Sequence, residues 1–90
     1  MSDMAFWRRI EIAADRLCGM ADRLGAELTP GVGPAEALAW RGAVMRCASC
    51  REGAACDQWQ ATHDHADAPP LYCRNQHMLS AFAERRIAAE

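Results

Sequence analysis

The residues of this sequence best suited to chemistry are its cysteines, and four of the five are clustered. Cys47, Cys50 and Cys56 fall in the stretch RCASCREGAACDQW, and Cys73 follows in PPLYCRN, which gives the pattern C-x2-C-x5-C-x16-C. Thiolates are soft ligands, and four of them suit either a tetrahedral zinc ion or an iron–sulfur cluster. We therefore predict that these four side chains form one metal site within residues 47–73.

The expected cellular compartment supports a metal or redox site over disulfides. The first residues, MSDMAFWRRIEIAADRL, carry charges where a secretory signal needs an apolar run of about 7 to 15 residues. We expect a cytoplasmic protein, in which thiols stay reduced. No apolar run reaches about 18 residues, so no membrane span is expected. Ten basic and twelve acidic residues are spread along the chain without a basic stripe, which argues against nucleic acid as a ligand.

The elements that position these cysteines are predicted to be helices. Apolar residues recur three and four apart from Phe6 to Leu24, which predicts a first helix with one buried face, ended by Gly25. Cys18, beside Leu17 in this helix, is predicted to be a small buried core residue. Further helices are expected over 34–50, over 56–61 and from about residue 70. The predicted fold is all-α, one domain of residues 1–90, built as a small bundle of three to four helices organised around a four-cysteine metal site.

This arrangement brings the cysteines to helix ends. Cys47 and Cys50 are three apart at the end of the second helix, so they share a face. Cys56 opens the third helix, and Cys73 lies in the first turn of the fourth, where free backbone N–H groups favour a thiolate. A domain of ninety residues buries only about 60% of its unfolded surface, so a metal held there would also support the fold.

The spacing favours an iron–sulfur cluster. Structural zinc sites usually combine two short ligand pairs, whereas the second pair here, Cys56 and Cys73, is separated by 16 residues. The C-x2-C-x5-C segment resembles three of the four ligands in the [4Fe–4S] loop of DNA glycosylases of the endonuclease III type. That likeness covers ten residues and is accompanied by no helix-hairpin-helix and no catalytic Lys and Asp pair. It implies that the spacing suits a cluster, and it implies nothing about DNA repair.

The predicted function is that of a small [4Fe–4S] protein acting in electron transfer or in redox or oxygen sensing. Four cysteine ligands leave no open position on the metal for a substrate, which favours a carrier or sensor over an enzyme. Two alternatives use the same cysteines. One is a zinc-binding structural or interaction module, and the other is a metal-free thiol/disulfide redox switch.

Three arginines adjoin ligand cysteines and are candidates for tuning the site. Arg46, Arg51 and Arg74 would offset the negative charge of a four-cysteine cluster, and the alternative is that they simply face solvent. Asn75 either donates a hydrogen bond to sulfur or caps a backbone group, and the sequence favours the cap. Trp59 either shields a cluster or packs in the core.

Histidines offer further ligands. His77 follows Cys73 by four residues and is a possible substitute ligand. His63 and His65, in THDHAD, are either a metal pair or part of a solvated loop, and the loop is the preferred interpretation.

Three longer strings carry a family resemblance. MADRLGAELTPG, LAWRGAVMRCASCREGAACDQW and APPLYCRNQHML resemble a group of short bacterial proteins classed as a domain of unknown function. The shared pattern is RLG, then R-C-x2-C-x5-C-x2-W, then A-P-x-[FY]-C-x-N, and the likeness covers roughly residues 20 to 83. Here the chain departs at Gln60, where the group tends to have leucine, and at Arg74 and Gln76, where it tends to have proline and alanine. The resemblance implies a four-cysteine unit and no established activity.

These predictions indicate the kind of partner but not its identity. A carrier or sensor needs a protein redox or regulatory partner, whose identity the sequence does not give. The helix expected over 34–50 has a wide apolar surface, so a homodimer is a further possibility.

Overall fold

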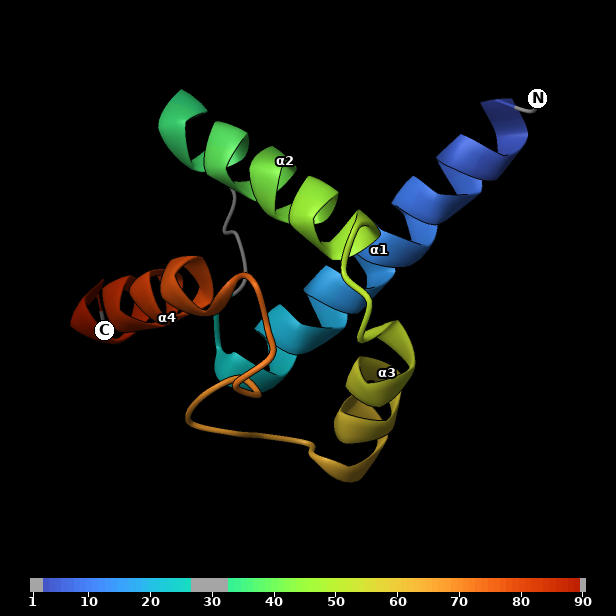
Figure 1. Cartoon of the computed structure of the whole chain (residues 1–90). Helices are drawn as coiled ribbons and strands as arrows, with labels where there is room; N and C mark the ends of the chain where they lie inside the picture. Colours follow the sequence, from blue (N-terminus) through green and yellow to red (C-terminus); the bar gives the residue numbers. More distant parts are fainter. Residues whose placement is uncertain (1–2, 27–32, 90) are drawn as a thin grey trace.

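The structure, a computed structural model, describes residues 3–26 and 33–89, with side chains described up to residue 84. The described residues form helices and turns without any strand, which confirms the predicted all-α class. The four helices in chain order are α1 (Asp3–Leu24), α2 (Pro34–Ala48), α3 (Gly53–Thr62) and α4 (Gln76–Ala89). Figure 1 shows that the long α1 crosses the molecule, with α2, α3 and α4 arranged around its second half.

The ends of α1 and α2 follow from local chemistry. Gly25 has a φ of +69°, the left-handed conformation that glycine adopts most easily, and α1 ends directly before it. The Ala26 N–H then donates to the Ala21 carbonyl at 2.8 Å, which satisfies a carbonyl that the helix end would otherwise leave free. Pro34 begins α2, where its missing N–H removes no helical hydrogen bond.

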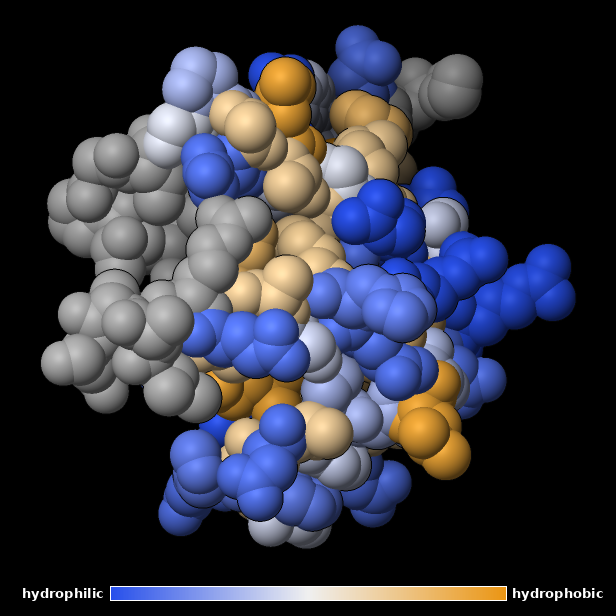
Figure 2. All heavy atoms as spheres, turned by 90° about the vertical axis from the view of Figure 1, so that its left-hand side faces the viewer, coloured by the Kyte–Doolittle hydropathy of each residue, from blue (hydrophilic) through white to orange (hydrophobic). Residues whose placement is uncertain are grey.

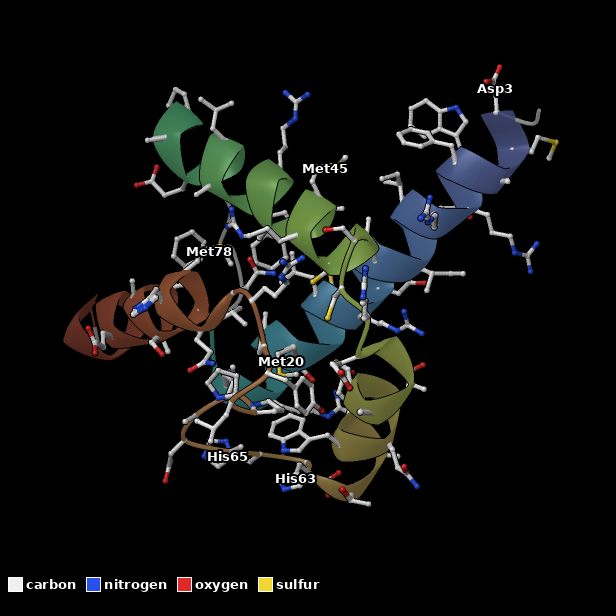
Figure 3. The ribbon with its side chains drawn as sticks, viewed as in Figure 1. Asp3, Met20, Met45, His63, His65 and Met78 are labelled. Atoms are coloured by element: carbon white, nitrogen blue, oxygen red, sulfur yellow. The ribbon has the colours of Figure 1, made fainter. Side chains whose placement is uncertain are left out.

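The core lies where the second half of α1 meets α2 and α4. Leu17 and Met20 of α1, Ala43 of α2 and Leu79 and Phe82 of α4 are all buried in one cluster. Met20 lies near the centre of the molecule in Figure 3. α3 contributes no fully buried residue and packs at the edge of this cluster. Three cysteines contact this core and are only half-buried: Cys47, Cys56 and Cys73. Trp59 packs against the core in the same way.

Several expected positions need correction. The buried face of α1 begins at Ala13, while Phe6 is 48% exposed because the first half of the helix extends past its neighbours. Cys18 is exposed, so the prediction of a buried core residue is wrong; it lies next to Leu17 in sequence but on a different side of the helix.

Helix boundaries also differ from the prediction. α2 ends at Ala48 and not at residue 50, and α3 is longer than expected, since it begins at Gly53. α4 begins at Gln76, six residues later than expected. Residues 71–75 form turns after Pro69 and Pro70, in which the Cys73 N–H donates to the Pro70 carbonyl at 3.0 Å.

Not all of the apolar surface is buried. Figure 2 shows one face on which apolar residues lie between charged ones. The largest exposed apolar side chains lie at the start of α1, on α2 and beside Cys73: Met4, Phe6, Trp7, Ile12, Leu38, Met45, Leu71 and Tyr72. Within the described residues, no helix combines the length and the apolar character needed to cross a membrane.

Candidate functional site

The four clustered cysteines line one small cavity, about 30 Å³ in volume. Cys47 comes from the last turn of α2, Cys50 from the turn that follows, and Cys56 from the second turn of α3. Cys73 comes from the turns before α4 and not from the helix itself, which corrects its predicted position. The remaining lining consists of three arginines and three other residues: Arg16, Arg46, Arg74, Gly53, Tyr72 and Asn75.

The thiols surround the cavity without closing on a single point. Among the described residues, no group of three or more His, Cys, Asp or Glu side chains is arranged to hold a metal ion. Metal ligation by these cysteines therefore remains a prediction. The structure brings together the four residues that such a site would need, from the end of α2, the start of α3 and two separate turns.

Amide groups donate hydrogen bonds to the sulfurs of the four cavity cysteines. The Asn75 side-chain amide donates to Cys47 Sγ at 3.2 Å, and the Glu52 backbone N–H donates to Cys50 Sγ at 3.4 Å. The Gln60 side-chain amide donates to Cys56 Sγ at 3.4 Å. A backbone hydrogen bond from Asn75 acts on Cys73 and favours its thiolate. Such N–H···S bonds stabilise sulfur in its anionic form, which is the form that binds metals.

Asn75 connects more parts of the site than any of its neighbours in the turns before α4. It is 2% exposed, and its Nδ2 donates both to Cys47 Sγ and, at 3.0 Å, to the Ala43 carbonyl. Its Oδ1 accepts from Arg46 Nε at 2.6 Å, which fixes the orientation of the amide. Its backbone carbonyl accepts from the Leu79 N–H at 2.9 Å within the first turn of α4. The two roles weighed for Asn75, sulfur donor and backbone partner, therefore occur together.

The cavity carries an excess of positive charge. Arg16 forms a bidentate pair with Asp57, at 2.8 and 2.9 Å, and this pair raises the pKa of Arg16 and lowers the pKa of Asp57. Arg46 donates to Asn75, and Arg74 donates to Ser49 Oγ at 3.4 Å. Neither arginine has a carboxylate partner among the described residues. Arg51, predicted to adjoin the site, is exposed and lies just outside this cavity.

Gly53 allows Arg16 to reach the cavity. A Cβ atom on Gly53 would meet the Arg16 guanidinium at its Cζ and at both terminal nitrogens. We expect Gly53→Ala to displace Arg16 with little loss of stability, because the guanidinium can move and alanine is the better helix former. The Arg16–Asp57 pair is partly exposed, so its loss is also small.

Urea unfolding checks this expectation. The free energy of unfolding of Gly53→Ala should lie within about 1 kcal/mol of wild type. Arg16→Gln is the matched variant, because it removes the same guanidinium while keeping Gly53. If Gly53→Ala lost several times more free energy of unfolding than Arg16→Gln, the expectation would be wrong. Glycine would then be needed at position 53 for the backbone and not for the Arg16 side chain.

Burial favours the protonated form of three thiols of the metal-free site, those of Cys47, Cys56 and Cys73. It raises the pKa of Cys47 to about 11, and the nearby Cys73 adds to this effect. Burial likewise raises the pKa of Cys56 and of Cys73. A cysteine in an unfolded chain has a pKa of about 8.5, so the folded protein retains these protons at a pH where the unfolded chain has lost them.

The metal-free protein should therefore lose stability at alkaline pH. The contribution is fully present below about pH 8.5 and declines as the pH rises toward about 11, where Cys47 titrates in the fold. The sequence has no lysine and one tyrosine, so few other groups ionise in this range. The urea midpoint of the reduced, metal-free protein should be lower at pH 10, about a unit inside this window, than at pH 7.5, about a unit below it. Cys18→Ala should leave it unchanged, and a midpoint that rises with pH would contradict the expectation.

The other predicted residues lie outside the cavity. Trp59 packs against the core and stacks on His63, with ring centroids 4.3 Å apart. His63 and His65 lie in the loop after α3, which Figure 3 shows at the opposite end of the molecule from α2. His65 lies 3.9 Å from an Asp67 oxygen and both side chains are exposed, which agrees with a solvated loop. His77 is exposed on α4 and does not line the cavity.

Three lining residues and one donor were not predicted from the sequence. Arg16 and Gln60 belong to segments 44 residues apart, and the Gln60 amide bridges them by donating to both the Arg16 carbonyl and Cys56 Sγ. Gly53 and Tyr72 lie close to cysteines in the sequence, and this proximity was the one sequence feature that could have indicated their place in the cavity. Nothing local distinguishes Arg16 from the other arginines of α1.

Comparisons with known proteins place the chain in a family and go no further. No curated protein and no solved structure matches the chain. The family described as "Family of unknown function (DUF6455)" matches residues 4–85, a range that contains the starts of α2, α3 and α4 and all four cavity cysteines. The chain therefore belongs to this family of unknown function.

Proposed function

We propose that Cys47, Cys50, Cys56 and Cys73 hold a [4Fe–4S] cluster and that the protein acts in electron transfer or redox sensing. The observation that carries this proposal is that all four cysteines line one cavity, together with three arginines. Four half-buried thiolates around one cavity would repel one another, as the effect of Cys73 on the pKa of Cys47 indicates. A bound cationic centre removes that repulsion, so the donor set suits a metal group better than it suits free thiolates.

The spacing of the cysteines favours a cluster over a single zinc ion, because structural zinc usually takes two short ligand pairs, whereas 16 residues separate Cys56 from Cys73. Zinc requires four sulfurs at about 2.3 Å from one point. The four described thiols line the wall of one shared cavity. A cluster has four separate irons, one for each cysteine, so it suits ligands spread around a shared volume.

The surroundings of the sulfurs suit a redox role. A [4Fe–4S] cluster supplies reversible one-electron transfer, and its potential depends on nearby charge, on hydrogen bonds to sulfur and on exposure to solvent. Here Arg16, Arg46 and Arg74 supply positive charge. Amide groups donate to the sulfurs of Cys47, Cys50 and Cys56. With all four cysteines used as ligands, no position is left for a substrate, which favours a carrier or sensor with a protein partner.

The experiment that tests this proposal is anaerobic purification with an absorption spectrum and analysis of iron, zinc and acid-labile sulfide. A cluster gives a brown protein that absorbs broadly near about 400 nm, with about four iron and four sulfide per chain. A colourless protein with one zinc per chain would replace the redox role with a structural or interaction role. A protein free of metal whose cysteines form disulfides reversibly would instead support a thiol switch.

A further inference from the structure

The exposed side of the site carries a surface with the composition of a protein interface. A surface hollow of about 230 Å³ shares Cys50, Tyr72 and Arg74 with the cysteine cavity. Its other lining residues are Ser49, Arg51 and Glu52. We refer to this hollow, together with the adjacent Leu71, as the mouth surface. Any molecule that docks on it lies beside Cys50.

The mouth surface has an excess of positive charge in a chain of net charge −2. Arg51 and Arg74 are both exposed, and neither has a carboxylate partner among the described residues. Glu52 is the one acidic residue of the hollow. Two arginines without carboxylate partners on one small surface attract a partner that carries carboxylates, because complementary charge speeds encounter and fixes orientation.

Apolar groups on the same surface point to a protein partner. Leu71 is 92% exposed, the highest value among the large apolar residues of the described chain, and Tyr72 beside it is also exposed. Both lie in the turns that hold Cys73. Arginine and tyrosine are enriched at protein interfaces, where an apolar centre is surrounded by charged groups. A small anion or a phosphate backbone would leave Leu71 without a contact.

We infer that the mouth surface docks a protein partner whose own surface is acidic around an apolar residue. This inference adds a partner site to the proposed function, because it places the partner beside the cysteine cavity. The purpose of the contact rests on the proposed function. The docking itself depends on Arg51, Arg74 and Leu71, which are exposed side chains and need no metal for their positions.

A labelled peptide tests the surface on the full chain as purified, with its metal content measured. The probe is a fluorescein-labelled oligoglutamate peptide, and the readout is fluorescence anisotropy at low salt. Arg51→Glu with Arg74→Glu should weaken binding by about tenfold or more, and salt near 1 M should abolish it. The matched control, Arg8→Glu with Arg9→Glu, makes the same change in net charge on the exposed start of α1 and should change binding by no more than about twofold.

A second peptide tests the apolar part. Replacing one central glutamate by phenylalanine should strengthen binding to wild type, and Leu71→Ser should remove that gain. Equal weakening by the control pair, the absence of any binding at low salt, or a DNA duplex that binds the same surface more tightly would each overturn the inference. A colourless protein that still binds as expected would overturn the cluster alone, while a brown protein that does not bind would overturn the docking surface alone.

Discussion

Replacing Cys47 by alanine is expected to abolish binding of the proposed [4Fe–4S] cluster. Cys47 is half-buried against the core and lines the cavity with the other three cysteines. A cluster deprived of one of four thiolates exposes an iron to solvent at this site. The absorption near about 400 nm should fall to the background, and iron should fall from about four per chain to nearly none. Alanine at Cys50, Cys56 or Cys73 should have the same effect.

The fifth cysteine provides a matched control. Cys18→Ala removes the same thiol from a position that is exposed on α1 and outside the cavity. It should leave colour, iron and sulfide unchanged. Circular dichroism and urea unfolding of the metal-free variants separate loss of ligand from loss of fold. Retention of full iron and sulfide in Cys47→Ala, or bleaching in Cys18→Ala, would contradict the assignment of the ligands.

The loss of the proposed cluster should also destabilise the protein. The site joins α2, α3 and the turns before α4, and α3 contributes no fully buried residue of its own. A group that binds only the folded state adds its binding free energy to stability. Wild type should therefore unfold at a higher urea concentration with its metal than without it. In Cys47→Ala that difference should disappear.

The sequence predicted the parts of this molecule that depend on local rules. Gly25 ended α1 and Pro34 began α2 as expected, because left-handed backbone and a missing N–H are properties of single residues. The convergence of the cysteines was also predictable, because three of them lie within ten residues of sequence. The start of α4 could not be predicted in this way, because two prolines and the turns after them delay the helix to Gln76.

Tertiary contacts account for what the sequence did not predict. Arg16 reaches the cavity because α1 packs on α3, where Asp57 binds it across 41 residues of sequence. Cys18 is exposed and Phe6 half-exposed because the neighbouring helices cover only part of α1. Periodicity indicates which residues share a face of a helix, but it does not say how far along that face a neighbour extends.

Asn75→Asp is expected to have the second large effect, on both stability and the site. The substitution keeps the shape of the side chain but removes its N–H donors to Cys47 Sγ and to the Ala43 carbonyl. It also places a carboxylate at a position that is 2% exposed, beside a sulfur. Arg46 already contacts Oδ1 and offsets part of the new charge. We expect a loss of about 2 to 3 kcal/mol in the free energy of unfolding.

The same variant should change the chemistry of the sulfurs. An N–H···S bond favours electron density on sulfur, and its replacement by a negative charge disfavours the reduced, more negative form of a cluster. The reduction potential of the cluster-loaded protein should therefore fall. Gln58→Glu is the matched control, because it makes the same amide-to-carboxylate change at an exposed position of α3. It should leave both stability and potential near their wild-type values.

Arg46 distinguishes a positioning role of Asn75 from a merely structural one. Arg46→Lys keeps the positive charge beside the cavity but removes the Nε donor that orients the Asn75 amide, and it leaves the N–H donors of Asn75 in place. If orientation matters, the two single variants should lower the potential in the same direction, and the double variant should lower it by less than their sum, because both act through Cys47 Sγ. A potential that neither variant moves, despite a clear loss of stability in Asn75→Asp, would reduce Asn75 to a structural link between α2 and α4.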